Sequence, residues 1–145
     1  MAAVDLVAAS VRPLNGAIVR RYPAASTNVT IGDAVYVKGD GTIDIADLDD
    51  VDQSQARGIV VAIGAFGKTT AAVGDVCDVV THGPVELANA TAMTEGAVVY
   101  VGNSGAIDQS ASATAGDFNY IIGYAEDTTV LYVQGQMIIP TAVPE

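Results

Sequence analysis

Apolar residues occur along the chain in short runs, and turn residues rich in Gly and Asp separate these runs. Short runs of this kind predict β-strands, because an amphipathic helix would need a longer repeat with a period of 3.6 residues. The predicted strands are residues 35–37, 43–45, 58–63, 76–80, 85–87, 98–101, 121–124, 130–133 and 137–139. Val and Ile together number 32 against 5 Leu, and β-branched side chains favour strands. The sequence therefore predicts an all-β fold.

Three segments stand out within this pattern. Residues 58–63 are apolar almost throughout, which predicts a strand buried on both faces. Gly83-Pro84 is expected to end the strand that begins at Val76, because proline cannot donate a hydrogen bond to a neighbouring strand. Residues 46–56 are the one stretch that could form a short helix, since their aspartates come early, where carboxylates suit a helix N-terminus. An acidic loop explains residues 46–56 equally well.

The strand pattern is duplicated within the chain. Residues 32–44 align without gaps on residues 96–108, and both segments read Gly-x-x-Val-Tyr-Val, then a Gly turn and Ile-Asp. With one more residue of offset, Gly58 falls beside Gly123, each at the head of an apolar strand. Two such units are each too small to bury a core alone. We therefore expect them to close on one another as a small β-barrel or β-sandwich.

The first 28 residues differ in charge from the rest of the chain. They hold Arg12, Arg20 and Arg21 against one acid, Asp5, whereas the remaining 117 residues carry a net charge of −13. We interpret residues 1–28 as an extended N-terminal arm that docks on another subunit, and residues 29–145 as the body with a short C-terminal tail. The alternative is that the segment forms a slightly basic first strand of the same domain.

Composition narrows the classes of function. A net charge of −11 repels phosphate, so we expect no nucleic-acid partner. The single Cys excludes an intrachain disulfide framework. The sequence has no apolar run of 18 residues and no basic segment before an apolar one near Met1, which favours neither a membrane span nor a signal peptide. We expect a protein made in the cytoplasm of its host, without a membrane partner.

Three groups of residues have side chains that could carry chemistry. Each group partly matches a known catalytic or binding motif but lacks one of its features. Cys77 and His82 could pair as thiol and imidazole, but a spacing of five along one strand points them to opposite faces. Residues 44–52 are acidic and could attract Ca²⁺, although they lack the ligand order of an EF-hand loop. Residues 64–69 end in Gly-Lys-Thr like a phosphate loop, but Ala62 stands where the first glycine is needed. We expect no enzyme, no cofactor and no dedicated metal centre, and weak cation binding by residues 44–52 is left open.

Five apolar segments follow one another in a characteristic order, namely 32–37, 58–62, 74–85, 96–101 and 122–133. This order, the duplicated unit and the lack of catalytic residues together resemble the head-decoration, or capsid cement, proteins of tailed double-stranded DNA phages. The resemblance covers about residues 29–135 and excludes the N-terminal arm and the C-terminal tail.

The resemblance implies a structural role on the virion. Such proteins bind the outer surface of the capsid, usually as homotrimers, and hold neighbouring subunits of the major capsid protein together. Arg12, Arg20 and Arg21 would then be the capsid contacts, because guanidinium groups can meet carboxylates on capsid subunits.

A glycan-binding module and a small enzyme are the two alternatives to this structural role. A glycan-binding module of a phage tail or fibre would need aromatic platforms, and the chain has no Trp but six Tyr, of which Tyr22, Tyr100, Tyr120, Tyr124 and Tyr132 could contribute. A small β-barrel enzyme would have to assemble a site around His82 from two protomers. We expect the structural role.

Overall fold

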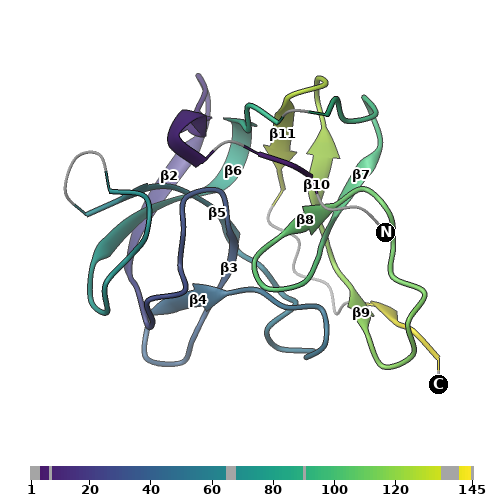
Figure 1. Ribbon diagram of the computed structural model, residues 1–145, viewed down its shortest axis with the longest axis horizontal. Coiled ribbons are helices and arrows are strands. Elements are labelled where there is room, and N and C mark those ends of the chain that lie inside the picture. The colour runs from purple at the N-terminus through teal and green to yellow at the C-terminus, as the bar shows by residue number, and fades with distance from the viewer. Residues whose placement is uncertain (1–3, 7, 65–67, 90, 135–140, 145) are drawn as a thin grey trace.

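The computed structural model describes residues 4–6, 8–64, 68–89, 91–134 and 141–144, which form an all-β structure (Figure 1). The described residues contain one short 3-10 turn, η1 (Ala8–Ser10), and no α-helix; residues 46–56 form hydrogen-bonded turns. The predicted fold class is confirmed. The strands are β1 (Arg12–Pro13), β2 (Ile18–Pro23), β3 (Ala34–Val37), β4 (Ile43–Ile45), β5 (Gly58–Ile63), β6 (Val76–Glu86), β7 (Val98–Val101), β8 (Ile107–Asp108), β9 (Phe118–Asn119), β10 (Ile121–Ala125), β11 (Val130–Val133) and β12 (Thr141–Ala142). The predicted strand at residues 137–139 lies outside the described residues.

Ten of these strands form one antiparallel sheet that curls into a half-barrel. The strand order is β4-β3-β5-β6-β11-β10-β7-β8, and β1 and β2 also pair with β6. In Figure 1, β2, β3, β4 and β5 lie to the left, and β7, β8, β10 and β11 lie to the right. Strands β9 and β12 form a separate two-stranded sheet.

The long strand β6 belongs to both halves of the sheet. Its first part, up to Val80, pairs with β5 and β2, and its last part, from Gly83, pairs with β11 and β1. The predicted strand end at Gly83-Pro84 is therefore wrong. Gly83 has a φ of +107°, and a Cβ there would lie 2.8 Å from the Cα of Ala17, so only glycine lets the strand bend past β2. Pro84 has no N–H to donate, and its carbonyl accepts the N–H of Leu14 at 3.0 Å.

The sequence repeat is also a repeat of strand pairing. Strands β3, β4 and β5 form the first unit with the start of β6, and β7, β8 and β10 form the second unit with β11. Val35 pairs with Gly58 in the first unit, and Val99 pairs with Gly123 in the second. Equivalent hydrogen bonds recur as well, such as Gly32 N–H to the Val60 carbonyl and Gly96 N–H to the Ala125 carbonyl, both at 2.7 Å.

Two hydrophobic clusters form the core. The first lies within the first unit and contains Ala24, Val29, Val35, Ile43, Val60, Ile63, Ala71, Cys77 and Val79. The second lies between the units and joins residues of the first unit, such as Ile59 and Val80, to Val99, Ile122 and Leu131 of the second. Strand β5 contributes to both clusters with alternate residues, which confirms that it is buried on both faces.

Residues of the N-terminal segment complete both units. Val11 packs in the cluster between the units and Ala24 in the cluster of the first unit, and both are buried. Ala25 N–H binds the Ile43 carbonyl at 2.8 Å, which brings the segment after β2 against β4. Residues 12–23 thus lie along β6 as strands of the sheet. Docking of residues 1–28 on another subunit stays a prediction.

Candidate interaction surfaces

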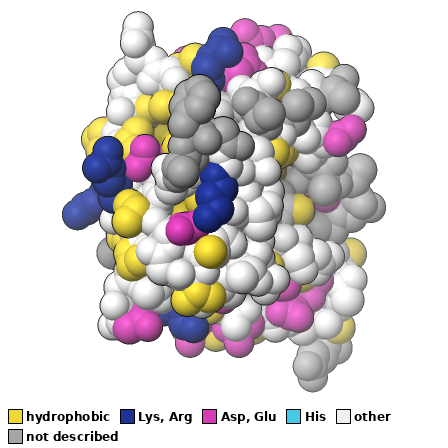
Figure 2. Space-filling view, turned by 60° about the vertical axis from the view of Figure 1, so that its left-hand side comes forward, with side chains coloured by type: hydrophobic (Ala, Val, Ile, Leu, Met, Phe, Trp, Pro, Cys, Tyr) yellow, Lys and Arg dark blue, Asp and Glu magenta, His cyan; other side chains and the backbone are white. Residues whose placement is uncertain are grey.

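Strand β2 is an exposed edge of the sheet. It pairs with β6 on one side, and Ile18 is 55% exposed while Val19 is 41% exposed. Arg20 and Arg21 follow them on the same strand and are exposed too. We name Ile18, Val19, Arg20 and Arg21 the β2 edge. In Figure 2, hydrophobic and cationic side chains lie next to one another on the side of the molecule that holds the first unit. Large apolar side chains on a protein surface often mark a binding site for another protein.

The structure places the three predicted capsid-contact arginines on two strands that both pair with β6. Arg20 and Arg21 lie on β2 and Arg12 lies on β1, and both strands run along β6. Arg21 Nε lies 3.1 Å from Asp78 Oδ1, and its side chain is 77% exposed, so this ion pair is open to solvent. Within the described residues, Arg12 and Arg20 form no ion pair. Exposed guanidinium groups of this kind can form hydrogen bonds with carboxylates of a partner protein.

A second surface lies on the outside of the second unit. The rings of Tyr124 and Tyr132 stack with centroids 5.3 Å apart and an interplanar angle of 22°. His82 meets Tyr132 edge-on at 5.6 Å, and the Tyr132 hydroxyl lies 3.4 Å from His82 Nε2. Val98 pairs with Tyr124 across β7 and β10, and its side chain is 37% exposed. We name Val98, Tyr124, Tyr132 and His82 the outer tyrosine face.

Sequence reasoning found the residues of this face but not the face itself. The sequence offers Tyr124 and Tyr132 only as separate aromatic residues, and His82 only as a candidate for catalytic chemistry. The signal that could have found the face is the repeat. The repeat aligns Tyr124 with Ile59, which lies on a packing face of the first unit. As a sugar platform the face is poor, because Tyr124 and Tyr132 cover one ring face of each other, and Tyr120 is only 1% exposed.

Cys77 and His82 lie in different environments. Cys77 is fully buried in the cluster of the first unit, which confirms the interpretation as a small hydrophobic residue. Burial, with Asp75 and Asp78 nearby, raises the pKa of the Cys77 thiol to about 11, so it is not a nucleophile at neutral pH. His82 is exposed and contacts Tyr132. The two side chains do not form a reactive pair.

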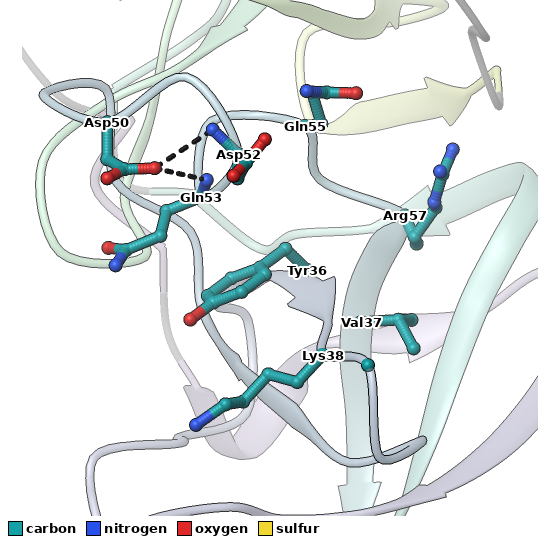
Figure 3. A pocket seen from close by; sticks show the side chains of 9 residues that line it. Tyr36, Val37, Lys38, Asp50, Asp52, Gln53, Gln55 and Arg57 are labelled. Carbon is teal, nitrogen blue, oxygen red and sulfur yellow. Dashed lines mark hydrogen bonds between the residues drawn. The ribbon is translucent and has the colours of Figure 1, made fainter.

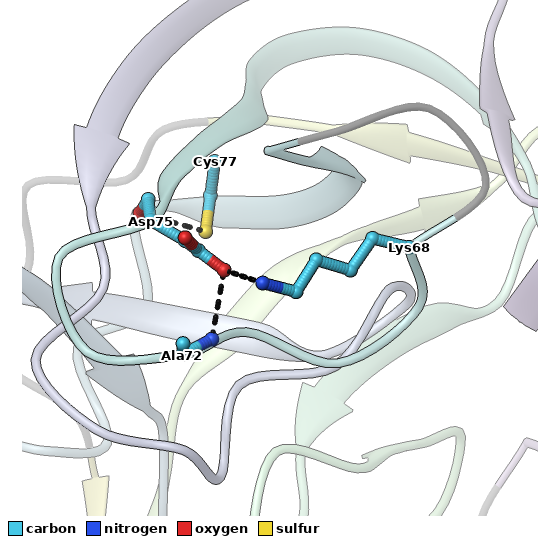
Figure 4. A network of polar contacts seen from close by, with 4 residues as sticks. All are labelled: Lys68, Ala72, Asp75 and Cys77. Carbon is cyan, nitrogen blue, oxygen red and sulfur yellow. Dashed lines mark hydrogen bonds and ion pairs between the residues drawn. The ribbon is translucent and has the colours of Figure 1, made fainter.

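Lys68 of the Gly-Lys-Thr segment is held in an ion pair. Its ammonium group donates a hydrogen bond to Asp75 Oδ2, which also accepts the N–H of Ala72 at 2.8 Å (Figure 4). The bond from Lys68, followed by the bond from Ala72, lowers the pKa of Asp75. Lys68 thus ties the chain after β5 to Asp75, just before β6. Residues 65–67 of the Gly-Lys-Thr segment lie outside the described residues.

The acidic segment 44–52 borders a shallow polar cavity of about 510 Å³ (Figure 3). Tyr36, Lys38, Asp50, Gln55 and Arg57 are among its lining residues. The carboxylate of Asp50 is occupied locally, because it accepts backbone N–H bonds from two residues that follow it. Within the described part of the chain, no group of three His, Cys, Asp or Glu side chains is arranged to hold a metal ion.

Comparisons with known proteins assign no family. No protein-family model matches the chain, and no curated protein matches its sequence. Within the described residues, no helix has the length and apolar character needed to cross a membrane.

Proposed function

We propose that this protein is a structural decoration protein that binds the outer surface of a phage head. In this role it stabilises contacts between subunits of the major capsid protein, and it acts as a homotrimer. The observation that carries the proposal is the β2 edge. In a chain with a net charge of −11, an exposed edge strand combines two arginines with two exposed aliphatic side chains.

The properties of the β2 edge suit binding to a protein shell. Apolar side chains supply the buried centre of an interface, and arginine is enriched at such centres because it pairs with carboxylates in a fixed geometry. The acidic remainder of the chain keeps the exposed body soluble. In a homotrimer, three linked contacts raise the effective concentration of one another, so each one can be weak while the whole complex holds firmly.

The proposal is tested by sedimentation with expanded phage heads. We expect the wild-type protein to pellet with the heads, and the double variant Arg20→Ala, Arg21→Ala of the β2 edge to stay in the supernatant. Lys38→Ala is the control, because Lys38 is an exposed cation on the turn between β3 and β4, outside the β2 edge. Circular dichroism melts must show that both variants fold.

Substitution is a sharper test than deletion of residues 1–28. Deletion would strip β1 and β2 from β6 and remove Val11 and Ala24 from the core, so a loss of binding could follow from unfolding. If wild-type protein fails to pellet with any expanded head, or if the folded double variant pellets as well as Lys38→Ala, the β2 edge does not bind capsids.

A further inference from the structure

The two units of the chain stack with the same faces in the same order. In the first unit, Ala34, Ile59 and Val80 are fully buried, because the second unit covers them. The opposite face of the first unit, with Val35 and Val79, encloses that unit's own cluster. The first unit therefore has one face for its own cluster and one face for packing against a neighbouring β-unit.

The outer tyrosine face is the counterpart of that packing face. The repeat and the strand pairing place Val98 at the position of Ala34, Tyr124 at that of Ile59 and Tyr132 at that of Val80. In the first unit this face lies against a β-unit, whereas in the second unit Val98 is 37% exposed and both tyrosines are partly exposed. Within the part of the chain that the structure describes, this packing face of the second unit is therefore left uncovered.

We propose that the outer tyrosine face binds a second copy of this chain. A β-unit of the same chain covers the equivalent face of the first unit, but it does so with residues such as Val99 and Leu131, which are fully buried in every copy. A second copy therefore presents its own outer tyrosine face across a symmetry axis. Tyrosine is enriched in the centres of protein interfaces, where its ring is buried at a low cost in side-chain entropy. Beside this face, Glu126 and Asp127 line a cavity of about 480 Å³ together with Pro84, which pairs with Tyr132.

This inference adds to the proposed function the surface through which copies meet. The inference rests on the proposed function only for the number of copies in the assembly. The outer tyrosine face shows where two copies meet, but it does not determine the symmetry of the assembly. A trimer around a three-fold axis and a dimer would both bury the tyrosine stack.

The test is sedimentation velocity of the full chain at protomer concentrations from about 1 to about 100 µM, because association depends on concentration. We expect the wild-type protein to associate, and Val98→Asp to raise the concentration for half-association at least about tenfold, since an unpaired charge is expelled from an apolar contact. Val51→Asp is the matched control: Val51 is 38% exposed, against 37% for Val98, and lies in the acidic loop away from this face. We expect Val51→Asp to associate like the wild type.

Two results would overturn the inference. One is a wild-type protein that stays monomeric over the whole range, and the other is a Val98→Asp variant that associates as well as Val51→Asp.

Binding to expanded heads separates this inference from the proposed function. If a monomeric wild-type protein binds heads and Val98→Asp does not, the face contacts the capsid and self-association is refuted while the capsid role stands. Association through Val98 without any head binding would refute the capsid role alone.

Discussion

Replacing Asp33 with asparagine is expected to stabilise the protein at neutral pH. Asp33 is half-buried just before β3, where its carboxylate accepts the N–H of Thr30 at 2.8 Å and packs against Gly105 of the second unit. Burial raises the pKa of Asp33 from 3.8 to about 6, and the bond from Thr30 offsets part of this rise. At pH 7 the folded protein therefore keeps a carboxylate charged where the neutral acid would be more stable.

The size of the effect follows from the pKa. A rise from 3.8 to about 6 corresponds to about 3 kcal/mol, at about 1.4 kcal/mol for each pKa unit. Because the folded state binds this proton more tightly than the unfolded state, the contribution of Asp33 to stability falls as the pH rises from 3.8 to 6. Asparagine is neutral at every pH and keeps an oxygen for Thr30. We expect Asp33→Asn to add about 1–3 kcal/mol to the free energy of unfolding at pH 7, and almost nothing near pH 3.5.

Urea denaturation followed by circular dichroism at pH 3.5, 5 and 7 measures this difference. Asp40→Asn is the control, because it removes the same charge from an exposed turn, where hydrogen bonds from Thr42 lower the pKa of Asp40. Relief of general repulsion in an acidic chain would stabilise both variants alike. An equal gain in both variants, or a gain from Asp33→Asn that does not change with pH, would refute the reasoning.

Three further predictions concern stability and reactivity. Gly58→Ala and Gly123→Ala should each prevent folding or lower the free energy of unfolding by more than about 3 kcal/mol. A Cβ at Gly58 would lie 2.1 Å from the Val80 carbonyl oxygen, and one at Gly123 would lie 2.0 Å from the Tyr132 carbonyl oxygen. Gly39→Ala is the control and should leave the thermal melt unchanged, because the space around Gly39 is open. Leu131→Ala should cost about 2–5 kcal/mol in urea denaturation, because Leu131 is fully buried between the units; a cost below about 1 kcal/mol would contradict that packing. Cys77 should react with a thiol reagent at least about 100-fold faster in urea than in the native protein, because the native thiol is buried and its pKa is raised. Equal reaction rates would show that the thiol is accessible in the folded protein.

The sequence could predict most of the strands because their signals are local. Apolar runs such as residues 58–63 and 130–133 are bounded by turn residues, and the strands lie where these runs lie. The duplication was also visible, and strand pairing repeats it down to Val35 with Gly58 and Val99 with Gly123. A sequence repeat of this kind reports strand register as well as strand positions.

The interaction surfaces depend on contacts between distant residues, which a local pattern does not contain. Whether residues 18–23 form a free arm or an edge strand depends on pairing with β6, nearly sixty residues later. The continuation of β6 through Pro84 depends on Gly83, which adopts a positive φ and, because it lacks a Cβ, leaves room for the backbone of Ala17. His82 meets Tyr132 because β6 pairs with β11 from Gly83 onward, which brings two residues fifty positions apart together.

The shared strand β6 has a consequence for how the protein comes apart. The same eleven residues are a strand of the first unit and the pairing partner of β11 in the second, so neither unit can unfold without breaking pairs that β6 makes with the other. Heating should therefore give a single cooperative transition despite the internal duplication. The two halves, although alike, are no longer separable modules: a cut of the polypeptide at the middle of this strand would yield two fragments that regain order only when mixed.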